Sequence, residues 1–80
     1  MSPTVLKVGS YRVVIYTLDH PPAHVHVISA SRIAKFSLDP VLLLDNAGYL
    51  SRELRKIERI IIDNQPLLLD AWNEIHRGTE

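Results

Sequence analysis

The chain has 80 residues, four histidines, no cysteine, and nine basic against nine acidic side chains, so its formal net charge is zero. This length suits one domain of modest stability, because so short a chain buries only about 60% of its unfolded surface. The missing cysteines exclude a disulfide-stabilised secreted miniprotein and any thiolate metal ligand. The first seven residues do not resemble a signal peptide, and no apolar run is long enough to span a membrane. We expect a single domain over residues 1–80, soluble and cytoplasmic.

Charge is distributed unevenly along the chain. Residues 1–37 contain four basic residues and one acidic residue, a net charge of +3, whereas residues 38–80 contain five basic and eight acidic residues, a net charge of −3. Three of the four histidines also lie in the first half. If this difference has a role, the first half faces an anion and the second half faces a basic partner.

Two runs of β-branched and aromatic residues, 4–8 and 11–16, flank Gly9-Ser10 and predict a β-hairpin with a tight turn. The predicted register pairs Val8 with Tyr11, Lys7 with Arg12, Leu6 with Val13 and Val5 with Val14. Because side chains alternate across a strand, one face of this hairpin forms the better core. That face carries Leu6, Val8, Tyr11, Val13 and Ile15.

Residues 19–23 contain two prolines and predict a loop. Residues 24–29 and 32–38 then predict a second hairpin around Ala30-Ser31, in which His26 lies opposite Lys35. Only this register separates apolar from polar side chains, and burial opposes a one-residue slip. The apolar face holds Val25, Val27, Ala34 and Phe36, and the polar face, which we expect to be open, holds His24, His26, Lys35 and Ser37.

The rest of the chain predicts helix. Asp39-Pro40 ends the strand or makes it an edge segment, residues 41–44 pack on an apolar surface, and residues 46–48 form a loop. Ser51 is the expected N-cap of a helix, and Pro66 should kink or break that helix near Asn64-Gln65. An apolar stripe at helical spacing continues across the break: Leu54, Ile57, Ile61, Leu68, Trp72 and Ile75.

The predicted fold class is therefore α+β. A four-stranded antiparallel sheet of two hairpins occupies residues 1–44. A kinked helix, or two consecutive helices, occupies residues 51–77 and covers one face of the sheet. Trp72 is expected in the core.

Three histidines within seven residues form the one chemically distinctive motif, Asp19-His20-Pro21-Pro22-Ala23-His24-Val25-His26-Val27. His24 and His26 project on the same side of a strand about 7 Å apart. Three interpretations remain open: a solvated strand face, a phosphate or nucleic-acid site, and a divalent metal site with His20 as third ligand. Lys35 opposite His26 favours phosphate over metal, because a positive neighbour disfavours a bound cation. Asp19 either orients His20 or caps the turn.

A nuclease interpretation gives these residues roles without a metal. His26 takes a proton from a ribose 2′-hydroxyl, His24 or His20 protonates the leaving oxygen, and Lys35 or Arg12 stabilises the charge on the phosphorane. Basic and aromatic side chains on an open sheet face suit a phosphate chain and stacked bases. The candidate nucleic-acid-binding residues are Lys7, Arg12, Tyr16 and Lys35.

The chain resembles a family of small bacterial proteins catalogued as a domain of unknown function (family four-one-six-zero). The resemblance covers nearly the whole chain, and it is carried mainly by Gly9-Ser10-Tyr11-Arg12, the histidine motif, Leu38-Asp39-Pro40-Val41, Ser51-Arg52-Glu53-Leu54 and Ala71-Trp72-Asn73-Glu74. This chain has Asp19 where the family usually has Glu and Ser37 where it often has Trp, so an aromatic platform beside His24 is missing.

Members of such families are often encoded beside a second small protein in loci that look like toxin–antitoxin pairs. The resemblance thus implies a small cognate partner protein, and an RNA target for a toxin. The alternatives are a non-catalytic antitoxin or adaptor and a small metal-binding protein. Apolar side chains on the open face also predict a homodimer or a tight partner complex. These side chains are Val5, Val14, Tyr16 and Ile28.

Overall fold

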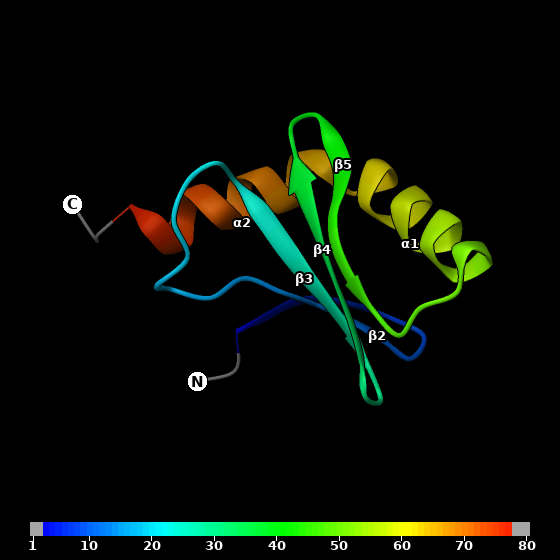
Figure 1. Ribbon diagram of the computed structural model, residues 1–80. Coiled ribbons are helices and arrows are strands. Elements are labelled where there is room, and N and C mark those ends of the chain that lie inside the picture. The colour runs from blue at the N-terminus through cyan, green and yellow to red at the C-terminus, as the bar shows by residue number, and fades with distance from the viewer. Residues whose placement is uncertain (1–2, 78–80) are drawn as a thin grey trace.

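The computed structural model describes residues 3–77; residues 1, 2 and 78–80 of the predicted domain lie outside the described residues. The strands are β1 (Thr4–Val8), β2 (Tyr11–Val14), β3 (His24–Ser29), β4 (Arg32–Leu38) and β5 (Val41–Ala47). Two helices follow, α1 (Ser51–Asp63) and α2 (Gln65–His76). The fold class is α+β, as predicted, and the helices run one after the other along one face of the sheet (Figure 1).

The sheet is an antiparallel meander in the order β1-β2-β3-β4-β5. Every predicted pair of the second hairpin is confirmed, including His24 with Ser37 and His26 with Lys35. In the first hairpin, Val8 with Tyr11, Lys7 with Arg12 and Leu6 with Val13 are confirmed. The predicted pair of Val5 and Val14 is wrong, because the register shifts between Thr4 and Leu6 and Thr4 pairs with Val14 instead.

Both predicted two-residue turns form, and each begins with a residue of positive φ. Gly9 has φ 58°, which glycine adopts without steric cost. Ala30 has φ 54°, although its Cβ makes this region unfavourable. The pairing of β3 with β4, which places the histidines, therefore includes a turn residue that is not suited to its conformation.

The fifth strand was not predicted. Residues 41–44 were expected to pack somewhere apolar, but they begin β5, which runs through Ala47 and so includes two residues of the predicted loop. Ser37 accounts for part of this pairing. Its hydroxyl donates to the Pro40 carbonyl at 2.6 Å and accepts the Leu42 N–H at 3.1 Å, which holds the β4–β5 turn.

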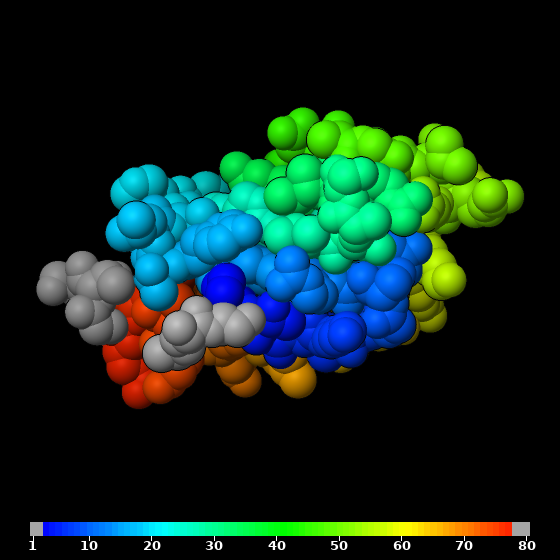
Figure 2. All heavy atoms as spheres, turned by 90° about the horizontal axis from the view of Figure 1, so that it is seen from below, coloured from blue at the N-terminus to red at the C-terminus, as the bar shows by residue number. Residues whose placement is uncertain are grey.

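The helices follow the predicted break. Asn64 separates α1 from α2, and Pro66 lies in the first turn of α2, where its missing N–H costs nothing. Ser51 is the first residue of α1 rather than its N-cap, and the Leu50 N–H donates to the Glu53 side chain at 3.2 Å. The segment between β2 and β3, light blue in Figure 2, lies beside the C-terminal part of α2, in red.

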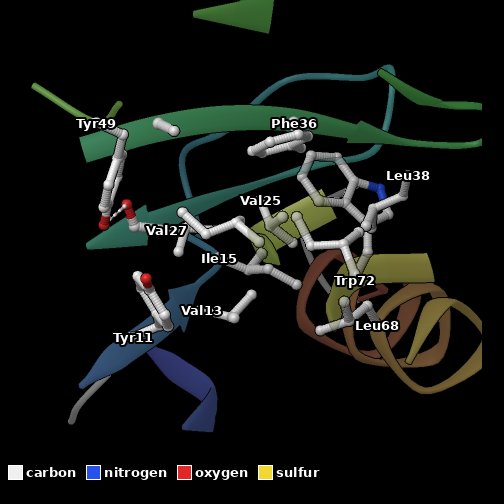
Figure 3. Close-up of a cluster of buried hydrophobic side chains, with 13 residues drawn as sticks. Tyr11, Val13, Ile15, Val25, Val27, Phe36, Leu38, Tyr49, Leu68 and Trp72 are labelled. Atoms are coloured by element: carbon white, nitrogen blue, oxygen red, sulfur yellow. Dashed lines mark hydrogen bonds between the residues drawn. The ribbon is translucent and has the colours of Figure 1, made fainter. Parts of the chain in front are cut away.

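The core fills the space between the sheet and the helices. Val25, Val27, Ala34 and Phe36 are buried there, as the binary pattern predicted. The helical stripe is confirmed as well, since Ile57, Ile61, Leu68 and Trp72 are buried and the two end members pack against the cluster. Figure 3 shows the indole of Trp72 beside Leu38 and Leu68, and the Tyr49 hydroxyl donating to the Val27 carbonyl at 3.1 Å.

The apolar surface differs from the prediction. Val14 is buried although it lies on the face without helices, because it pairs with His26 and the rings of Tyr16 and His26 meet beside it. Val5 is half-buried and packs against the core. Tyr16 is exposed as predicted, and β5 adds three further exposed apolar side chains, Leu42, Leu43 and Leu44, each 44–55% exposed.

The positive φ of Ala30 leads to a prediction about the stability of the protein. Ala30→Gly should raise the free energy of unfolding by about 0.5–1 kcal/mol, because glycine removes the strain at φ 54° but gains freedom in the unfolded chain. Ala47→Gly, in β5 at a position without positive φ, should lower it by a similar amount. Urea denaturation measures both, and a destabilised Ala30→Gly variant would show that this turn is not strained.

Candidate functional site

The segment between β2 and β3 brings Asp19 to the histidines. A tight turn positions Asp19, whose N–H donates to the Tyr16 carbonyl at 3.2 Å while its Oδ2 accepts the Tyr16 N–H at 3.2 Å. The turn directs the carboxylate towards β3, where Oδ2 lies 3.4 Å from Nε2 of both His24 and His26. This contact with both histidines differs from the two roles predicted for Asp19, a turn cap or a partner of His20. The connectivity was the available clue. The loop between β2 and β3 ends at the first residues of β3, so its side chains can lie beside them.

His24 is buried, contrary to the expected open face. Its ring centroid lies 5.1 Å from that of Trp72, because α2 extends beside the first residue of β3. Its Nδ1 lies 2.9 Å from the Pro22 carbonyl oxygen. A carbonyl only accepts hydrogen bonds, so this contact assigns a proton to Nδ1 and leaves Nε2, in the neutral ring, with a lone pair facing Asp19.

His26 is half-buried at the edge of the open face. Its ring lies 5.0 Å from the Tyr16 ring and 5.3 Å from the His24 ring. Burial holds the pKa of His26 below its ordinary value of 6.5, and His24 and Lys35 add to this effect, while Asp19 acts against it. His26 is therefore neutral at pH 7 and can act as a base or as a ligand.

The polar atoms of these three residues converge. One ligand atom each from Asp19, His24 and His26 lies within 4.8 Å of the other two, and no other such group of three occurs among residues 3–77. The Nε2 atom of His26 is buried and has no hydrogen-bond partner. We call this group the Asp-His-His cluster. Its donors are of the type that binds first-row divalent metals.

His20, expected as a third ligand or as an acid, lies outside the cluster. It is exposed and lines a hollow of about 390 Å³ next to the cluster. Asp19, Trp72 and His76 also line this hollow, and the His76 ring stacks on the indole at 3.9 Å. Solvent in the hollow therefore has access to Asp19.

The remaining candidate residues lie on the face of the sheet opposite the helices. Lys7 and Arg12 are paired across β1 and β2 and are exposed. Tyr16 is 38% exposed beside His26, and Lys35 is half-buried opposite His26. The predicted nucleic-acid-binding residues thus share one face, with the Asp-His-His cluster at its end.

Fold and site together define a small α+β domain that has an open sheet face with three cationic side chains, one of them opposite Asp45, and a partly buried Asp-His-His cluster. The model of the family DUF4160, a domain of unknown function, matches residues 10–73, and the chain belongs to this family. No curated protein and no solved structure matches the chain. Among residues 3–77, no helix is both long and apolar enough to cross a membrane.

The charges around His26 predict a measurable change in its pKa. Lys35→Gln should raise the pKa of His26, because it removes a positive charge that disfavours the imidazolium form. Lys7→Gln, at an exposed position on β1, is the control and should leave this pKa unchanged. An NMR titration of the His26 ring protons in metal-free buffer measures both variants. Equal pKa values in the wild type and Lys35→Gln would mean that Lys35 does not act on His26.

Proposed function

We propose that the protein binds nucleic acid, with RNA as the expected target, through its open sheet face, and that it works as one member of a toxin–antitoxin-type pair. The observation that carries the proposal is the composition of the face that the helices leave uncovered. Lys7, Arg12 and Lys35 lie there together with the exposed ring of Tyr16. Ammonium and guanidinium groups bind phosphates, and an exposed aromatic ring stacks on unpaired bases.

The strand register supports this proposal. Arg12 lies directly between Lys7 and Ile28 in one row across the sheet, and Ile28 pairs with Ile33. The adjacent row places His26 beside Lys35. A single-stranded RNA that crosses this face would meet the cations Lys7 and Arg12 first and the apolar side chains of Ile28 and Ile33 next. In the adjacent row it would meet the imidazole of His26 and the ammonium group of Lys35. Such alternation of charge and flat or apolar surface suits a phosphate backbone with unstacked bases.

Catalysis by the histidines remains a prediction. His26 is neutral, as a general base must be, and Lys35 is adjacent. The Nε2 atoms of His24 and His26, however, both face Asp19, and His24 is buried. An acid–base pair made of these atoms requires the cluster to open. The geometry therefore supports nucleic-acid binding more directly than metal-independent cleavage.

The proposal of a partner protein rests on a different surface, the edge of the sheet at β5. β5 is an edge strand with three successive leucines, each 44–55% exposed. Leu43 pairs with Phe36 on the helix side of the sheet and Leu42 pairs with Ser37 on the other side, so the leucines surround the edge. Exposed apolar side chains at a sheet edge mark interaction sites. The register shift between Lys35 and Phe36 leaves Leu44 without a partner on β4, and a bulge of this kind disrupts simple strand addition. We infer that a partner or a second copy packs on the leucine side chains. This edge lies on the opposite side of the sheet from Lys7 and Arg12, which belong to β1 and β2, so one domain can bind both.

RNA binding has a specific expected pattern. Lys35→Ala should weaken binding of a single-stranded RNA, and the slope of log affinity against log salt should fall by about 0.7, because one phosphate contact is lost. Arg12→Ala should behave in the same way. Arg55→Ala removes an exposed charge from α1, on the helical side, and is the matched control. Fluorescence anisotropy at several salt concentrations measures all four proteins.

The control decides between a binding face and general attraction to a polyanion. If Arg55→Ala weakens binding and flattens the salt dependence as much as Lys35→Ala, the sheet face is not the binding surface.

The leucine patch predicts the assembly state. Leu43→Lys should abolish a homodimer, or a complex with the cognate partner, because it places a charge in a desolvated contact. Leu67→Lys, at a 49% exposed position on α2, should leave assembly unchanged. Light scattering, alone and with the product of the adjacent gene, measures both. A wild-type protein that stays monomeric at high concentration and does not bind that product would contradict the interface.

A further inference from the structure

The geometry points to a divalent metal site in the Asp-His-His cluster: we propose that Nε2 of His24, Nε2 of His26 and a carboxylate oxygen of Asp19 bind a first-row divalent cation such as Zn²⁺. This inference is independent of nucleic-acid binding by the sheet face. The sequence offered His20 as the third metal ligand, and the structure instead places Asp19 there.

The distances within the cluster suit a bound metal better than hydrogen bonds. A charge-assisted hydrogen bond between imidazole and carboxylate has an N···O distance of about 2.7–2.9 Å. Both Nε2···Oδ2 distances here are 3.4 Å, and the contact of His26 with Asp19 lacks the geometry of a good hydrogen bond. A tetrahedral zinc ion with ligands at about 2.0–2.2 Å holds neighbouring ligand atoms about 3.3–3.6 Å apart. The two distances are therefore too long for good hydrogen bonds and match two edges of a zinc coordination tetrahedron. The two imidazole nitrogens lie within 4.8 Å of each other and would close to a similar edge length when the metal binds.

The hydrogen bonds that hold His24 and Asp19 also resemble those around bound metals. Nδ1 of His24 donates to the Pro22 carbonyl, which leaves Nε2 as the ring nitrogen that faces the cluster. Metal-bound histidines commonly donate their second ring N–H to a backbone carbonyl, which fixes the ring and its tautomer. The Tyr16 N–H, which donates to Asp19 Oδ2, positions the carboxylate in the same way. Two of the three ligands thus have outer partners of the kind found around metals.

The surroundings suit a site with one open position. Three protein ligands leave the fourth position of a tetrahedral ion for water or substrate. His24 is 6% exposed and packs on Trp72, so this ligand is fixed, while Asp19 lines the hollow beside the cluster. Lys35 disfavours a cation, but the Asp19 carboxylate contacts both imidazoles directly and offsets that charge.

The test uses the untagged, full-length protein, stripped with EDTA and titrated with ZnCl₂ by calorimetry. We expect one Zn²⁺ per chain. Asp19→Asn, His24→Gln and His26→Gln should each weaken binding at least 10-fold, whereas His20→Gln should leave the affinity unchanged within about 3-fold. Circular dichroism identifies variants that fail to fold. Asp19→Asn preserves the side-chain shape and is the variant most secure against this.

A second measurement needs no variant. Added Zn²⁺ should raise the melting temperature of the wild-type protein, and EDTA should reverse the increase, because a ligand that binds only the folded state stabilises it. The inference is overturned if the wild type does not bind Zn²⁺ at 1 mM, or if folded Asp19→Asn binds as tightly as the wild type. A larger loss in His20→Gln than in Asp19→Asn would overturn it in favour of three histidines.

Discussion

The convergence of two imidazole nitrogens and a carboxylate oxygen at the beginning of β3 is the constraint on which the site depends. Two imidazole nitrogens and a carboxylate oxygen face one another in a partly buried place, where water screens them poorly. A proton or a cation between these atoms stabilises such an arrangement. The surrounding structure holds two of these side chains in place. Trp72 packs on His24, the Pro22 carbonyl accepts the Nδ1–H of His24, and the Tyr16 N–H donates to the Asp19 carboxylate.

The same constraint links the two layers of the molecule. Trp72 belongs to the core between sheet and helices, and its indole also contacts His24. A change in the cluster is therefore transmitted to the packing of α2. Conversely, the Pro66 break sets the direction of α2 and brings Trp72 to the end of the sheet. The fold and the site thus share one residue, and the stability of the small core depends partly on how the cluster is neutralised.

Sequence patterns predicted those parts of the structure in which periodicity and burial agree. The β3–β4 register followed from separating Val25 and Val27 from Lys35, and the helix break followed from Pro66. β5 was missed because Val41–Leu44 shows no alternation and follows a proline, and half of its surface stays exposed at an edge. Bulges such as the one at β1 leave no signal in a short strand either.

The candidate site was predicted only in part, for a related reason. Periodicity describes side chains along one element, so it paired His24 with His26 and placed Lys35 beside them. It does not describe where a proline-containing loop passes, and the role of Asp19 depends on that path. Burial of His24 likewise depends on a helix that lies about fifty residues further along the chain.

The proposed metal site can be tested by a crystal structure of the protein grown with Zn²⁺, with diffraction recorded on both sides of the zinc absorption edge. We expect an anomalous peak about 2.0–2.2 Å from Nε2 of His24, Nε2 of His26 and a carboxylate oxygen of Asp19. An anomalous map with no peak among these three atoms, or with its peak at His20 or His76 instead, would contradict it.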